Sequence, residues 1–103
     1  KLIHPGVIAE DLYYSALAVA KEWGYGEDEV NCVWFGHGTG LMISEPPYLQ
    51  KGEKRQIQAN SFINIEPGIF IPRYGTTSVE DQLFVSENGC EFVTQTPREL
   101  HIR

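Results

Sequence analysis

One stretch of this 103-residue chain shows the periodicity of a helix, and it lies near the start. Between Val7 and Trp23 the apolar side chains recur every three or four residues and form a single stripe: Ile8, Leu12, Ala16, Leu17, Ala20 and Trp23. Acidic residues in the early turns and Lys21 near the end suit the helix dipole, and Gly24 and Gly26 supply a stop. We therefore predict one long helix over residues 7–23.

The second half of the chain is typical of an antiparallel sheet. Four runs rich in β-branched and aromatic residues are bounded by glycine, proline or asparagine: Ser61–Ile65, Ile69–Ile71, Val79–Ser86 and Cys90–Thr94. Asn88-Gly89 is the strongest hairpin signal in the chain, and residues 72–77 are predicted to be a turn. A helix followed by such strands predicts an α+β fold, in which one long helix packs on a curved antiparallel sheet.

The segment between the helix and these strands is less regular. We expect, in order, an apolar run, a glycine-rich turn that presents His37, a short extended piece that stops at Pro46-Pro47, and a loop; these cover residues 32–35, 36–40, 41–44 and 50–60. The total length allows one small domain, so residues 1–103 are taken as a single unit.

Charge and composition exclude several classes of protein. The chain has 14 acidic and 8 basic residues, a net charge of -6, and no basic cluster dense enough to neutralise several phosphates, which argues against nucleic-acid binding. No apolar run reaches the roughly 18 residues that a membrane span needs. Cys32 and Cys90 lie far apart and form no metal-type pair, which favours a reduced, cytoplasmic protein over a disulfide-linked one.

Three side chains are candidates for chemistry. His37 stands between two glycines, Glu66 ends an apolar strand, and Glu80 lies within another predicted strand. A carboxylate in such a strand is costly to bury unless it is paired or bound to a cation. The alternative is that the histidine only makes a hydrogen bond within its turn, and that each glutamate faces solvent. One imidazole with two carboxylates suits Mn, Fe, Co or Zn acting on water rather than a structural thiolate zinc.

Several short motifs follow one another in order along the chain. They are Gly36-His37-Gly38-Thr39-Gly40-Leu41, Glu45-Pro46-Pro47, Ile65-Glu66-Pro67-Gly68-Ile69, Val79-Glu80-Asp81, Ser86-Glu87-Asn88-Gly89-Cys90-Glu91 and Pro97-Arg98-Glu99-Leu100. Together they resemble the latter part of the pita-bread metallopeptidase superfamily, which includes methionine aminopeptidase, aminopeptidase P, prolidase and creatinase. The likeness is greatest to the Xaa-Pro peptidase branch, and it covers nearly the whole chain.

The resemblance implies a dinuclear metal-dependent hydrolase. In that family two aspartates, a histidine and two glutamates hold two divalent metals (Mn, Co, Zn or Fe), and a metal-bound water attacks the scissile carbonyl of a peptide or small amide. His37 and Glu66 match the histidine and the first glutamate, and Glu80 matches the glutamate that bridges both metals. The aspartates come from an upstream segment, and the chain starts at Lys1. We therefore expect the carboxy-terminal part of the catalytic domain of a larger, homodimeric metallopeptidase, inactive by itself.

Two positions depart from the family pattern. The family usually has a second histidine, in contact with substrate, at the position of Ser44, and prolidase-like members have an arginine at the position of Ser78. A serine hydroxyl donates one hydrogen bond but carries no charge near neutral pH, unlike imidazole. No catalytic residue is therefore assigned with certainty. The alternatives are a divergent, creatinase-like hydrolase of non-peptide substrates, and a non-catalytic interaction domain of the same fold.

Overall fold

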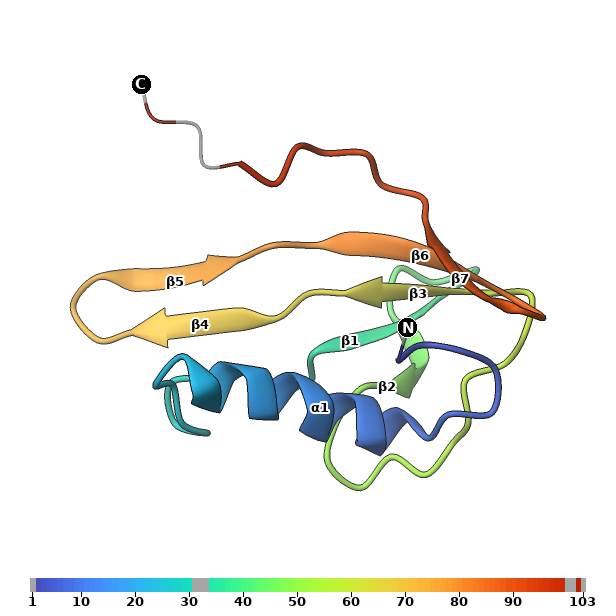
Figure 1. Cartoon of the computed structure of the whole chain (residues 1–103), viewed down its shortest axis with the longest axis horizontal. Helices are drawn as coiled ribbons and strands as arrows, with labels where there is room; N and C mark the ends of the chain where they lie inside the picture. The colour runs from blue at the N-terminus through green and yellow to red at the C-terminus, as the bar shows by residue number, and fades with distance from the viewer. Residues whose placement is uncertain (1, 31–33, 100–101, 103) are drawn as a thin grey trace.

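The computed structural model describes residues 2–30, 34–99 and 102 (Figure 1). These residues form one helix, α1 (Ala9–Glu22), and seven strands: β1 (Gly36–Thr39), β2 (Glu45–Tyr48), β3 (Ser61–Ile65), β4 (Gly68–Ile71), β5 (Gly75–Ser78), β6 (Asp81–Ser86) and β7 (Gly89–Phe92). A five-stranded antiparallel sheet has the order β2-β1-β3-β6-β7, and β4 pairs with β5 in a second ladder. The expected α+β class is confirmed.

Strands β3 to β6 form one long hairpin, residues 61–86, that is interrupted at its middle. Ile65 pairs with Asp81 at the end of the β3–β6 ladder, and Gly68 pairs with Ser78 at the start of the β4–β5 ladder. The same register therefore continues across the interruption. Glu66 and Pro67 lie on one side of this gap. Proline has no amide hydrogen to donate to a ladder, which explains why the pairing opens here.

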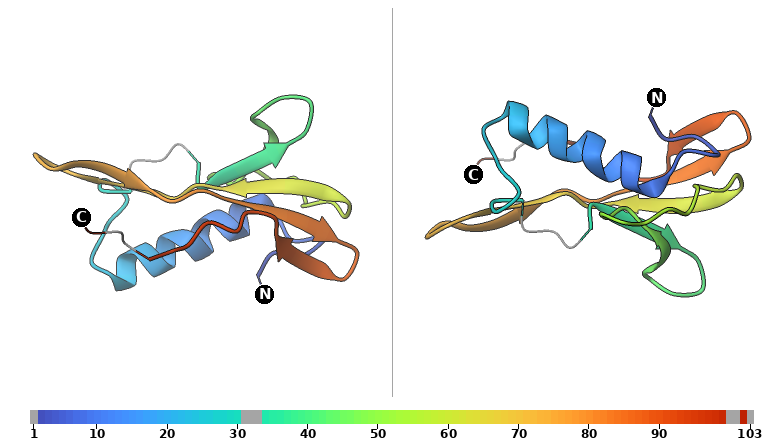
Figure 2. Two further views of the ribbon diagram at one scale, coloured as in Figure 1. Left: turned by 90° about the horizontal axis from the view of Figure 1, so that it is seen from above. Right: turned by 90° about the horizontal axis from the view of Figure 1, so that it is seen from below.

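Helix α1 covers one face of the sheet (Figure 2). Its buried side chains, Ala9, Leu12 and Leu17, join a core with residues of the sheet and loops: Val30, Phe35, Leu49, Ile57, Ile63 and Val85. Both views in Figure 2 show the β1–β2 hairpin leaning away from the sheet on the opposite side to α1. One face of the sheet is therefore apolar and is covered by α1, and the β1–β2 hairpin leans toward the other face.

The helix was predicted to within two residues at its start and one at its end. Gly24 has a left-handed φ of 85°, and the amide of Tyr25 donates to the Ala20 carbonyl, which closes the last turn. The expected place of Trp23 on the buried stripe is wrong, since its side chain is 78% exposed. This residue follows the last helical one and turns away from the core.

The prediction for residues 36–48 was wrong in detail. The glycine-rich segment is a strand, β1, between β2 and β3, and not a turn. The extended piece lies at Glu45–Tyr48, so it includes the two prolines, while residues 41–44 form the connecting loop. The prolines are tolerated because β2 is an edge strand, which needs fewer amide donors.

Close packing of backbones explains the glycines of β1. A β-carbon on Gly36 would lie 2.2 Å from the Asn64 carbonyl oxygen, and one on Gly38 would lie 2.7 Å from the Pro46 carbonyl oxygen. Real β-carbons do not approach backbone atoms so closely. These glycines therefore allow β2 and β3 to pack against the strand that carries His37.

The later strands also differ from the prediction at their ends. The predicted turn over residues 72–77 is shorter, because β5 begins at Gly75 and pairs with β4. Strand β6 begins at Asp81, so Val79 and Glu80 lie outside it. The predicted hairpin is confirmed between β6 and β7, but its turn residues are Glu87 and Asn88, because Gly89 already pairs with Ser86 as the first residue of β7.

Cys90 is a half-buried free cysteine that packs against the core, whereas Cys32 lies outside the described residues. In the described part of the chain, the helix is too short and too polar to span a lipid bilayer.

Glu10 ties the start of α1 to the loop that precedes β3. Its carboxylate accepts hydrogen bonds from the backbone amide of Gly52 and from the ammonium group of Lys54. The hydrogen bond from Lys54, followed by that from Gly52, lowers the pKa of the Glu10 carboxyl below its ordinary value. A lowered pKa means that the charged carboxylate stabilises the folded state.

Glu10→Gln is expected to lower the melting temperature at pH 7, because a neutral amide cannot pair with Lys54. The deficit should be complete above about pH 5 and shrink as the pH falls through the folded-state pKa, which lies below the ordinary value of about 4.3. Thermal unfolding of the variant and the original chain between pH 2 and 7 measures this. Glu22→Gln, on the exposed end of the same helix, is the control and should show no such pH-dependent deficit. A constant deficit for Glu10→Gln at all pH values would contradict the assignment.

Candidate functional site

His37 lies on β1 with only 4% of its surface exposed. Its Nδ1 is 2.9 Å from the backbone carbonyl oxygen of Gly38. Because a carbonyl only accepts, Nδ1 carries the hydrogen and donates it. In the neutral ring, the lone pair then resides on Nε2, which is the arrangement found in histidines that bind metals.

Glu66, directly after β3, brings a carboxylate to this nitrogen. Its Oε1 lies 3.4 Å from His37 Nε2 and accepts a hydrogen bond of 2.6 Å from the indole Nε1 of Trp34. In the neutral ring, Nε2 and Oε1 are both electron-pair donors, so a proton or a cation between them is needed to make the contact favourable. Two metal bonds of about 2.1 Å that meet at about 90–109° span roughly 3.0–3.4 Å, so this separation suits a shared metal ion.

Glu80 is exposed and lies in the link between β5 and β6. The prediction that it lies within a strand is therefore wrong. Its Oε1 accepts a hydrogen bond from the side-chain amide of Asn64. Asn64 is itself 6% exposed and is the pairing partner of His37 across β1 and β3. The amide of Asn64 thus connects Glu80 to the side of the sheet on which His37 lies.

The hairpin register places the two predicted carboxylates opposite each other. If the ladder continued through the gap, Glu66 would pair with Glu80, since Ile65 pairs with Asp81 immediately before it. Like charges directly opposite on neighbouring strands are destabilising, and a cation between them would remove that repulsion. The structure brings His37 and Glu66 together. Within residues 2–30, 34–99 and 102, however, no three His, Cys, Asp or Glu side chains form a group that could hold a metal.

The two serines at the unusual positions have different surroundings. Ser44 directly precedes β2, and continuing the β1–β2 register places it opposite Thr39. The hydroxyl oxygens of both residues are buried and make no hydrogen bond to another described residue. Ser78 ends β5 and is exposed, and it lines a shallow cavity of about 370 Å³ with Glu80, Asp81 and residues 96–99.

Sequence reasoning missed two polar contacts of the site. Asn64 stands within the apolar run Phe62-Ile63-Asn64-Ile65, and a buried amide there needs a partner, which was an available signal. The indole of Trp34 gave no such signal, because it lies 32 residues from Glu66 in the sequence.

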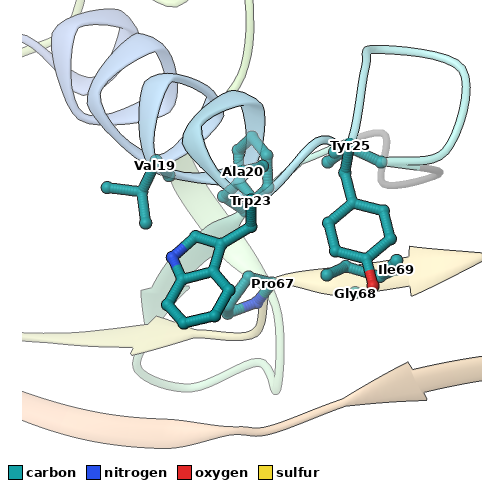
Figure 3. A pocket seen from close by; sticks show the side chains of 10 residues that line it. Val19, Ala20, Trp23, Tyr25, Pro67, Gly68 and Ile69 are labelled. Atoms are coloured by element: carbon teal, nitrogen blue, oxygen red, sulfur yellow. The ribbon is translucent and has the colours of Figure 1, made fainter.

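A second cavity, larger than the one beside Ser78, lies elsewhere. It measures about 440 Å³ and is bounded by the end of α1 and the start of β4, with an apolar lining that includes Val19, Trp23, Tyr25 and Ile69 (Figure 3). Neither His37 nor either candidate glutamate lines it. The side chains of His37, Glu66 and Glu80 therefore lie outside this apolar cavity.

Comparisons with known proteins identify the family of the chain. Residues 1–87 match the family model of metallopeptidase family M24. An Xaa-Pro dipeptidase of Pyrococcus furiosus is 38% identical over 96 residues, which are 93% of this chain and 27% of that protein. The chain thus spans about a quarter of the length of this curated relative.

Solved structures share the fold. A prolidase from Pyrococcus furiosus superposes with a TM-score of 0.87 at 37% identity, over 95% of this chain and 28% of that one. A methionine aminopeptidase from Rickettsia prowazekii gives 0.69 at 19% identity, over 89% and 45% of the two chains, and so supports the fold alone. The expected pita-bread architecture, one helix on an antiparallel sheet, is confirmed. Because the family model matches residues 1–87, which are most of this chain, the chain belongs to metallopeptidase family M24.

Proposed function

We propose that this chain is the carboxy-terminal, metal-binding part of a longer hydrolase that uses two divalent metal ions to cleave Xaa-Pro peptides. The observation that carries the proposal is the approach of His37 Nε2 to Glu66 Oε1, at 3.4 Å, beside the gap in the long hairpin. The relatives named Xaa-Pro dipeptidase support the substrate class, and the 27% share of their length supports a longer polypeptide.

His37 would bind through Nε2, Glu66 through its carboxylate, and Glu80 from the opposite side of the gap. The donor set of one nitrogen and several carboxylate oxygens suits Mn, Co, Zn or Fe. Two further carboxylates, the family's aspartates, would come from the preceding part of the longer polypeptide.

The side chains around these ligands have definable tasks. The Gly38 carbonyl fixes the tautomer of His37, and the Asn64 amide restrains one oxygen of Glu80. When bound, the metals would activate a water and polarise the scissile carbonyl. The Ser44 hydroxyl is a donor of one hydrogen bond, but it cannot supply positive charge as a histidine would.

Substitution of the ligands tests the site. In the longer polypeptide, His37→Ala, Glu66→Gln and Glu80→Gln should each reduce bound metal and lower Xaa-Pro hydrolysis by more than about 100-fold, because each removes either the binding nitrogen or the negative charge of a binding carboxylate. Metal content by mass spectrometry and proline release measure the two effects. His4→Ala changes an exposed histidine outside the site and should leave both unchanged. Full metal occupancy in any of the three ligand variants would remove that residue from the proposal.

The 103-residue chain by itself should not hydrolyse Xaa-Pro dipeptides. With two of the five proposed ligands missing, it cannot hold a second metal or position the attacking water. Proline release from a dipeptide, measured with added Mn²⁺ and compared with the longer polypeptide, is the assay. Metal-dependent cleavage by the chain alone would show that the upstream carboxylates are unnecessary.

The alternative functions, hydrolysis of a non-peptide substrate or binding without catalysis, can also be tested. They are suggested by Ser44, which takes the position of the family's substrate-contacting histidine. Its buried, unpaired hydroxyl is compatible with a site rebuilt for a non-peptide amide or for binding alone. If the longer polypeptide is a peptidase limited by this position, Ser44→His should raise turnover of Xaa-Pro substrates. Ser44→Ala is the control and should give no gain. Unchanged or lower turnover for Ser44→His would favour the creatinase-like or non-catalytic alternative.

A further inference from the structure

The indole of Trp34 makes a hydrogen bond to one of the proposed metal ligands. Nε1 lies 2.6 Å from Oε1 of Glu66. The indole nitrogen can only donate, so the assignment of donor and acceptor is unambiguous. A hydrogen bond to an ionised carboxylate is about twice as strong as one between neutral groups.

The indole ring is itself held by the strand pair that carries His37. Its centroid lies 5.1 Å from that of Tyr48, with the ring planes tilted by 39°. Tyr48 is on β2, where it is the pairing partner of His37. Trp34 therefore connects Glu66 to the β1–β2 hairpin, the element that also fixes the imidazole.

Oε1 of Glu66 faces two groups at once, the Trp34 indole and His37 Nε2. A free glutamate at the end of a strand would sample several rotamers, and each would place its carboxylate differently. The hydrogen bond from Trp34 Nε1 holds the Glu66 carboxylate so that its Oε1 lies beside Nε2 of His37.

We propose that Trp34 is a positioning residue of the metal centre, whose indole N–H holds the Glu66 carboxylate in the orientation that binds a cation next to His37. This inference rests on the proposed function, since it assumes that Glu66 is a ligand. It extends that proposal to a residue that binds neither metal nor substrate directly.

Zinc affinity of the longer polypeptide is the first measurement, by competition with a chromophoric chelator. Trp34→Phe keeps an aromatic ring against Tyr48 and removes the N–H donor. It is expected to weaken zinc binding about tenfold, the lower end of the effect typical for partners that orient a metal ligand. Trp23→Phe, at the 78% exposed tryptophan, is the matched control and should change nothing. An unchanged affinity for Trp34→Phe would overturn the inference.

A double-mutant cycle separates this inference from the proposed function. If Trp34 acts through Glu66, Trp34→Phe should have no further effect on zinc affinity in a Glu66→Ala background. An equal effect in both backgrounds would overturn the inference, because the indole would then act elsewhere. If Glu66→Ala alone leaves zinc affinity unchanged, the ligand assignment in the proposed function fails. If Glu66→Ala weakens binding and Trp34→Phe does not, only the positioning role fails.

A spectroscopic measurement needs no substitution of Trp34 and so is independent of the folding of that variant. The indole N–H resonance of Trp34 can be identified in NMR spectra by its through-space contacts with the Tyr48 ring. It should move when zinc is added, because the acceptor oxygen then shares its electron pairs with the cation. The resonance of Trp23 should remain in place. A Trp34 resonance that is insensitive to zinc at saturating concentration would overturn the inference.

Discussion

The opening in the long hairpin is the constraint on which the site depends. Pro67 cannot donate to the facing strand, so the ladder stops there and resumes at Gly68 with the same register. The amide of Glu66 instead donates to the carbonyl of Phe35, which ties this end of β3 to the segment leading into β1. The gap therefore frees two carboxylate-bearing positions without loosening the hairpin as a whole.

The two sides of the sheet have separate roles. The helix side buries an apolar core against α1, and stability resides there, with the Glu10 carboxylate anchoring the helix start to Gly52 and Lys54. The polar cluster around His37 is held by hydrogen bonds, which join His37 to the Gly38 carbonyl, Trp34 to Glu66 and Asn64 to Glu80. Such a division allows a site of costly buried polar groups to persist, because the core on the other side stabilises the fold independently.

Membership of metallopeptidase family M24 is consistent with a site that is only part of a larger one. His37 and Glu66 approach each other, and Glu80 is held opposite by Asn64, yet the described residues do not supply a complete ligand set. The chain spans about a quarter of the length of the Xaa-Pro dipeptidase it resembles. The remaining carboxylates of the proposed centre would therefore have to come from elsewhere in a longer polypeptide.

The sequence by itself determined the helix, the class of fold and the hairpin between β6 and β7, because helical periodicity and turn chemistry are local properties. It also indicated His37, Glu66 and Glu80 as candidates. Only the tertiary structure decided that the glycine segment around His37 is a strand, since close neighbours such as the Asn64 carbonyl are remote in sequence. The same holds for the contact of Trp34 with Glu66 and for the place of Glu80 outside β6. Such contacts join residues that are far apart along the chain, so a local sequence pattern cannot predict them.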